Sequence, residues 1–163
     1  METEWTTLQD FPDYIISNEG DIVNKNSGRW MHLSETTQGV MKVGLVCGGK
    51  QHTRSVKVLV AENFVPGQDE VFDTPIHLDG NRRNNRADNL AWRPRWFAWE
   101  YARQFSNVTD KERIGPIRDL DNDERYFDVL ECATLNGLLF KDIRQGITMQ
   151  EAVFPTFQRF EFV

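Results

Sequence analysis

Apolar and polar positions alternate in short runs over the first third of the chain. The runs "YIIS", "IVN", "RWMHL" and "VMKVGLV" are separated by turns rich in Gly, Asn and Ser, a pattern typical of short β-strands. The following segment "TRSVKVLV" passes into a helix near "VKVLVAENF", which ends before Pro66-Gly67. We therefore predict an amino-terminal β-meander of about four strands that runs into a helix.

The middle of the chain changes from an extended piece to a helix. The stretch "TPIHL" is followed by a turn at Asp79-Gly80-Asn81, a loop of Asn and Arg residues, and the segment "ADNLAW". Beyond this segment, "RWFAWEYARQF" contains no helix breaker and predicts a helix whose aromatic residues fall on two stripes. One stripe holds Trp96, Trp99 and Arg103, and the other holds Phe97 and Tyr101.

The last third of the sequence has the features of a separate small unit. "GPIRDLDNDERYFDV" predicts a hairpin that turns at Asp121-Asn122-Asp123. "LECATLNGLL" and "FKDIRQGI" predict two helices with a short break between them, and this pair resembles a helix-turn-helix. "FQRFEFV" predicts a closing strand. We therefore divide the chain into two domains, residues 1–103 and 104–163.

The composition is that of a folded chain, because 163 residues with 39% hydrophobic and 12% aromatic content are enough to bury a core. No apolar run approaches the roughly 20 residues that a membrane-spanning helix needs, and the start "METEWTTLQD" lacks the features of a signal peptide. We expect no membrane association and a cytoplasmic location. Cys47 and Cys132 fit no zinc or disulfide pattern, so we expect two reduced, largely buried thiols.

The net charge of −6 hides an uneven distribution of charge along the chain. The segments carry −6 for residues 1–24, +5 for 25–61, −5 for 62–79, +4 for 80–103 and −4 for 104–163. Two basic blocks on one face would suit the phosphates of nucleic acid, because affinity for duplex DNA comes largely from cations that displace counterions. Charged residues scattered over the surface would give the same segment charges, unless the two basic blocks share a face.

Three stretches carry a family resemblance: "EWTTLQDFPDYIISNEGDIVN", "VKVLVAENFVP" and "IHLDGNRRNNRADNLAW". The chain resembles the HNH homing endonucleases found in bacteriophage introns and intergenic sites. The first stretch is similar to the small motif before the nuclease core, the second to the helix before it, and the third to the ββα-metal core. The resemblance implies an α+β fold with an amino-terminal β-meander, an HNH-like ββα core and a small carboxy-terminal helix-turn-helix-like module.

The resemblance also implies roles for individual residues in phosphodiester hydrolysis, which requires a water nucleophile, a base and a divalent cation. His77 matches the general base, and Asn89 matches the asparagine that ties down the loop and orients that base. Trp92 matches an apolar anchor. The other matched positions form the loop scaffold: Asp79, Gly80, Asn81, Asn84 and Asn85.

The two metal-ligand positions of the family pattern hold residues without donor atoms. The position just before the base is Ile76, and the position six residues beyond Trp92 is Ala98. Magnesium and manganese prefer oxygen ligands, which neither side chain supplies. We predict no metal site, and Mg²⁺ or Mn²⁺ as a cofactor only if catalysis is retained. Two further possibilities stay open: Asp79 or Glu100 ligates from a shifted register, or Ala98 is an engineered knockout of a toxic nuclease.

Candidate nucleic-acid contacts are cations of the meander, the helix that follows it, the Asn/Arg loop and the last predicted helix. Guanidinium forks suit phosphate geometry, and β-ribbons can lie in a DNA groove. The alternative is that these cations only solvate the surface. The candidates are Lys42, Lys50, Arg54, Lys57 (where the family commonly has histidine), Arg82, Arg83, Arg86, Arg93, Arg95, Lys141 and Arg144.

The aromatic helix at residues 95–103 cannot bury all its rings on one side, because neighbouring helix positions point about 100° apart. Trp96, Trp99 and Tyr101 are therefore candidate anchors for a protein partner or a homodimer. The sequence favours a phage-type HNH homing-endonuclease relative that binds double-stranded DNA, with lost or impaired cleavage, in the host cytoplasm if phage-encoded. Two alternatives remain: a non-catalytic protein-binding regulator or inhibitor (an anti-host or anti-defence factor), and an active DNA-nicking enzyme with displaced metal ligands.

Overall fold

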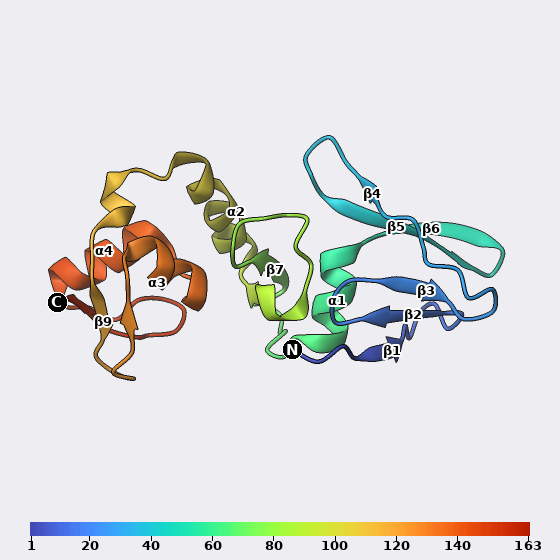
Figure 1. Cartoon of the computed structure of the whole chain (residues 1–163), viewed down its shortest axis with the longest axis horizontal. Helices are drawn as coiled ribbons and strands as arrows, with labels where there is room; N and C mark the ends of the chain where they lie inside the picture. Colours follow the sequence, from blue (N-terminus) through green and yellow to red (C-terminus); the bar gives the residue numbers. More distant parts are fainter. The chain divides into compact units, whose positions relative to one another are not determined.

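A computed structural model describes the whole chain, residues 1–163 (Figure 1). By its internal contacts the chain forms two compact units. Unit 1 comprises residues 1–77 and 81–95, and unit 2 comprises residues 78–80 and 96–163. The contacts thus group residues 96–103 with unit 2, whereas the sequence-based division keeps them in the first domain. Each unit encloses a hydrophobic core of its own.

Unit 1 contains two three-stranded antiparallel sheets. The first has the order β1-β2-β3 and is built from Trp5–Thr7, Tyr14–Ser17 and Ile22–Asn24. The second has the order β4-β5-β6 and is built from Ser34–Glu35, Met41–Cys47 and Lys50–Ser55. The strands expected at "YIIS", "IVN" and "VMKVGLV" are all present in these sheets.

The predicted single meander is therefore two sheets, and one predicted strand is absent. The segment "RWMHL" makes only an isolated bridge between Val23 and Trp30, and Trp30 is 65% exposed. Its chain leaves the first sheet there and begins the second at Ser34, so no ladder forms along it. Cys47 was expected to be buried but is exposed, because it ends β5 at the tip of a hairpin that turns through Gly48-Gly49.

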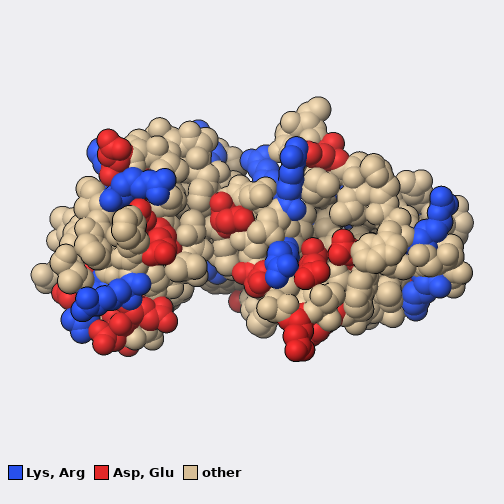
Figure 2. Space-filling model, in the orientation of Figure 1, with Lys and Arg blue, Asp and Glu red and all other residues tan.

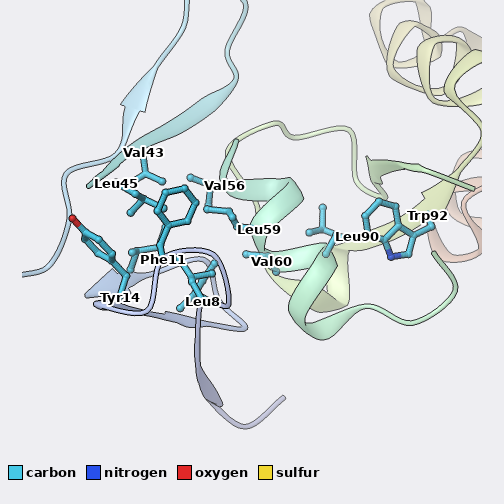
Figure 3. Packing of buried hydrophobic residues seen from close by; sticks show 13 residues of the cluster. Leu8, Phe11, Tyr14, Val43, Leu45, Val56, Leu59, Val60, Leu90 and Trp92 are labelled. Atoms are coloured by element: carbon cyan, nitrogen blue, oxygen red, sulfur yellow. The ribbon is translucent and has the colours of Figure 1, made fainter. Parts of the chain in front are cut away.

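Helix α1, Val56–Phe64, forms the centre of the unit 1 core and matches the helix that the sequence predicts. Its buried face includes Val56, Leu59 and Val60, which recur at helical spacing. In Figure 3 these side chains lie between residues of the two sheets on one side and Leu90 on the other. Burial of this face fixes the position of the strands that follow the helix in sequence.

Strands β7 (Thr74–His77) and β8 (Leu90–Arg93) pair as an antiparallel ladder, and α1 packs against both. A short 3₁₀ turn, Ala87–Asn89, leads directly into β8. Trp92 on β8 is buried, and its indole Nε1 donates a hydrogen bond to the carbonyl oxygen of Val65 at 2.9 Å. This bond and the packing on α1 hold the ladder in place.

Unit 2 combines three helices with a small sheet. Helix α2, Arg95–Gln104, starts at the last residue of unit 1, and 3₁₀ turns follow at Phe105–Asn107 and Asp110–Arg113. The sheet has the order β10-β9-β11 and is built from Arg125–Tyr126, Ile117–Asp119 and Phe160–Phe162. Helices α3 (Val129–Asn136) and α4 (Phe140–Met149) are the predicted pair. The mixture of helices and antiparallel sheets is the predicted α+β class.

Candidate active site

His77 lies at the end of β7, where its backbone pairs with Leu90 of β8. Its Nε2 atom is 2.7 Å from Oδ1 of Asn85, and the Asn85 side chain is buried. Because an amide oxygen only accepts hydrogen bonds, this contact places the imidazole proton on Nε2. The lone pair of the neutral ring is then on Nδ1.

The loop before β8 is held by hydrogen bonds from its own asparagines. Asn89 is buried, and its Nδ2 donates to the backbone oxygen of Asn84 at 2.9 Å. The backbone NH of Asn84 donates in turn to the oxygen of Asn81 at 3.0 Å. The family motif gave the role of orienting His77 to Asn89 and treated Asn85 as scaffold. The direct contact from Asn85 was missed, and the run "NRRNN" was its only sequence signal.

The turn between β2 and β3 supports the same loop from the other side. The backbone NH of Ala87 donates to the oxygen of Asn18 at 2.7 Å. At Gly20, where φ is +93°, a Cβ atom would lie 3.4 Å from Cβ of Asn85 and 3.6 Å from Cγ1 of Val56. The turn of the amino-terminal motif therefore packs against Asn85 and the start of α1.

The two metal-ligand positions of the family pattern do not fit a divalent cation. Ile76 is 3% exposed and pairs with Ala91 across the β7–β8 ladder, so an apolar side chain fills the position before His77. Ala98 lies on α2 and offers only a methyl group. The proposed substitute Glu100 holds the ammonium of Lys141 at 2.6 Å. No cluster of three or more His, Cys, Asp or Glu side chains suited to a metal ion occurs in the structure.

Two arginines of the loop are paired with carboxylates within unit 1. Arg83 meets Glu35 at 2.8 Å. Arg86 contacts both Glu19 and Asp88 at 3.3 Å. In Figure 2 many Lys and Arg side chains lie next to Asp and Glu, whereas those at the right-hand edge of the view have no acidic neighbour on the drawn face. These pairs reduce the positive charge that the loop offers to a polyanion.

The third loop arginine and one arginine of the second sheet contact groups other than carboxylates. Arg82 donates from Nη1 to the backbone oxygen of Gln38. Arg54 lies over the ring of Phe11, at 5.2 Å from its centroid. The remaining candidates of unit 1 lie on β5, at the β5–β6 hairpin end, on α1, on β8 and at the start of α2: Lys42, Lys50, Lys57, Arg93 and Arg95.

The candidate cations of α4 are engaged in ion pairs inside unit 2. Arg144 is paired with Glu112, a carboxylate that is 4% exposed and also caps the 3₁₀ turn at Thr109. Lys141 is paired with Glu100 near the surface. Arg144 therefore has a structural partner that the sequence did not reveal, because Glu112 is distant in sequence.

Replacing Arg144 with Ala should destabilise unit 2 by about 3 kcal/mol, because it leaves the buried Glu112 carboxylate without its cation. Replacing Lys141 with Ala on the same helix should cost less than about 1 kcal/mol, since its pair is exposed. Urea unfolding of the two variants measures the difference. Equal losses of stability would show that the Glu112 pair does not support the fold.

The aromatic helix α2 divides its rings between the interior and the surface. Phe97 and Tyr101 are buried, and the Tyr101 hydroxyl donates to the oxygen of Leu78 at 2.6 Å. Trp96 is 56% exposed and Trp99 is 60% exposed, so the stripe that holds both tryptophans faces the surface. Tyr101 therefore does not belong to the partner-binding surface that the sequence predicts, because its hydroxyl has a partner inside unit 2.

Comparison with known proteins identifies relatives of this chain. The chain is 32% identical over 121 residues to the DNA endonuclease I-HmuI of Bacillus phage SP01, an alignment that covers 71% of this chain and 68% of that protein. A solved structure described as "DNA binding and cleavage by the HNH homing endonuclease I-HmuI" matches with a TM-score of 0.59 and 23% identity over 98% of both chains. The chain belongs to the HNH homing endonuclease family.

Other HNH relatives match a smaller part of the chain. An uncharacterized HNH endonuclease of Acanthamoeba polyphaga mimivirus is 36% identical over 90 residues, and a second one from the same virus is 35% identical over 92 residues. The alignments cover 55% and 56% of this HNH chain, but only 23% and 27% of the two viral proteins. No protein-family model matches the chain. None of its helices combines the length and the apolar character required to cross a membrane.

Proposed function

We propose that this HNH chain binds duplex DNA on an endonuclease scaffold and has lost, or largely lost, metal-dependent cleavage. One observation carries the proposal. His77 is half-buried and bonded to the buried Asn85, while the adjacent metal-ligand position holds the buried side chain of Ile76. A base without a divalent cation leaves the charge of the phosphate and of the leaving oxygen without stabilisation.

The DNA partner follows from the family. The relative I-HmuI is named as a DNA endonuclease, and its solved structure is described as one of DNA binding and cleavage. In this chain, cations without a carboxylate partner remain on α1 and in the loop before β8, where Lys57 and Arg82 lie. These residues are suited to contact phosphate oxygens, and the rigid β7–β8 ladder would fix the protein on the duplex.

The binding of a labelled duplex at increasing salt concentration tests the proposal. We expect the logarithm of the association constant to fall linearly with the logarithm of the salt concentration, with a slope steeper than about −3, because each neutralised phosphate contributes about −0.9. Chelation of divalent ions with EDTA should leave the affinity unchanged. A chain that shows no duplex binding even at low salt would contradict the proposal.

A protein-binding regulator on the same scaffold is the second candidate. Its specific support is the exposure of Trp96 and Trp99 on α2, since large aromatic side chains are common anchors of protein interfaces. This candidate predicts little duplex binding at any salt concentration, so the same titration separates the two functions. A homodimer through this helix would in addition make sedimentation depend on protein concentration.

A further inference from the structure

Unit 2 contains a groove of about 650 Å³ that is lined by α2, by the 3₁₀ turn at Asp110–Arg113 and by the start of α4. All of its lining residues belong to unit 2. The volume falls within the range of sites that hold a small molecule, which is roughly 300 to 1,000 Å³. His77 and the asparagine loop contribute nothing to its walls, so the groove is a separate feature of the chain.

Side-chain bonds hold the walls of the groove together. The side-chain oxygen of Gln104, on α2, accepts a hydrogen bond from the backbone NH of Phe140, at the start of α4, at 2.8 Å. The buried Glu112 carboxylate accepts two hydrogen bonds from Thr109, at 2.8 and 2.7 Å, and pairs with Arg144 on α4. Because these bonds tie the three lining elements to one another, the groove is a preformed part of unit 2.

Trp99 and Arg103 line the groove from α2. The guanidinium carbon of Arg103 lies 4.2 Å from the centroid of the Trp99 ring, and the tryptophan is 60% exposed. The cation–π contact holds the two side chains together and leaves the guanidinium donors without a carboxylate, since Arg103 takes part in neither ion pair of the groove. The pair therefore presents a flat apolar ring beside an uncompensated positive charge.

The remaining charge of the groove is also positive. Four cations and three carboxylates line it. Two of the cations are neutralised by two of the carboxylates, in the ion pairs that α4 forms. This leaves Arg103 and Lys111 against one exposed carboxylate, that of Asp110. A ligand that combines negative charge with a flat ring matches these walls, and a nucleotide has both.

We propose that this groove binds one unpaired nucleotide of a DNA strand, with the base stacked on Trp99 and the phosphate held by Arg103 and Lys111. The inference rests on the proposed DNA-binding function and assigns a ligand to unit 2. The nucleotide must be unpaired, because the faces of a base inside a duplex are covered by its neighbours. Stacking accepts any of the four bases, since each has a flat face. An apolar segment of a partner protein fits less well, because it would bury both cations without a counter-ion.

Binding of the full chain to two matched DNAs tests the inference. One DNA is a labelled, fully paired duplex, and the other is the same duplex with a single-stranded extension at each end. Affinities are measured by fluorescence anisotropy in EDTA. Wild type should bind the extended DNA about tenfold more tightly, as expected for one stacked base. Trp99→Ala should remove most of this preference without changing the affinity for the paired duplex, and Trp99→Phe should keep most of it because the aromatic face remains.

Trp96→Ala is the matched control, because Trp96 is an exposed tryptophan of the same helix that does not line the groove. It should leave the preference for the extended DNA unchanged. Arg103→Ala should weaken binding of the extended DNA and reduce its salt slope by about 0.7, the value for one phosphate of a single strand. Arg125→Ala, which removes an exposed cation of unit 2 outside the groove, should do neither. Equal losses of preference in the two tryptophan variants would overturn the inference.

Tryptophan fluorescence provides a second readout, because a base that stacks on an indole quenches its emission. A single-stranded oligonucleotide should quench wild type and Trp96→Phe to a similar extent and should quench Trp99→Phe less. Equal quenching of the two variants would show that the base does not lie on Trp99.

The two DNAs also separate this inference from the proposed function. If wild type binds both DNAs with the same affinity, the nucleotide site is wrong and duplex binding stands. If it binds only the extended DNA, and does so through Trp99, the nucleotide site stands and duplex binding is wrong. If it binds neither DNA, both proposals fail.

Discussion

Replacing Ile76 with Asp should turn the chain into a Mg²⁺-dependent DNA-nicking enzyme, with a rate about 10²-fold or more above that of wild type. The base position is already built, since His77 is fixed by the buried Asn85. The position next to His77 in the same strand, Ile76, lacks only a donor atom. A carboxylate there would meet the preference of magnesium for oxygen ligands.

Three variants make this prediction specific. His77→Ala in the restored background should abolish nicking, because the water then has no base. Ile76→Val should remain inactive, since valine keeps this buried position apolar and supplies no oxygen donor. Circular dichroism checks that each variant is folded. A folded Ile76→Asp variant that binds DNA and still fails to nick it with Mg²⁺ or Mn²⁺ would show that the missing donor next to His77 is not the cause of inactivity.

Replacing Trp92 with Ala should destabilise unit 1 by about 3 to 5 kcal/mol, which is enough to unfold a marginally stable domain. The ring is 3% exposed, belongs to the core around α1, and donates its indole NH to the oxygen of Val65. The substitution leaves a cavity and removes the hydrogen bond to the carbonyl oxygen of Val65. Trp92 therefore acts as the apolar anchor of the β7–β8 ladder that carries His77.

Trp30→Ala is the control, because it makes the same substitution at another tryptophan of the same unit. Trp30 is 65% exposed, and its ring forms a T-shaped pair with the exposed ring of Trp5, so its loss should cost about 1 kcal/mol or less. Thermal and urea unfolding compare the two variants. A Trp92→Ala protein as stable as Trp30→Ala would show that the core of unit 1 does not depend on this ring.

Much of the fold was predictable because the local pattern and the final packing agree. The apolar spacing of "VKVLVAENF" gives α1 its buried face, and the two stripes of "RWFAWEYARQF" separate buried from exposed rings. The strand expected at "RWMHL" does not form, because there the local pattern and the final packing disagree. Its apolar residues fit a strand locally, but the chain crosses between two sheets there and finds no partner. Local pattern alone cannot show which strands meet.

The site was predictable only as far as its motif extends. The motif identified His77 and the asparagine loop. It also showed that Ile76 has no donor atom at a position where the family has a metal ligand. It did not show that Arg83 would pair with Glu35, or that Arg144 would pair with Glu112, because these partners are distant in sequence. Counting cations in a segment therefore overstated the charge available to DNA, since an ion pair formed by folding removes a cation from that count.

We expect the scaffold of this HNH chain to hold DNA without cutting it. Nicking of supercoiled plasmid by the wild-type protein, at concentrations that saturate duplex binding and with Mg²⁺ or Mn²⁺ present, tests this claim most directly. We predict supercoiled DNA that remains intact while the protein is bound to it. Metal-dependent nicking that disappears in His77→Ala would contradict the claim and show that other side chains seat the cation.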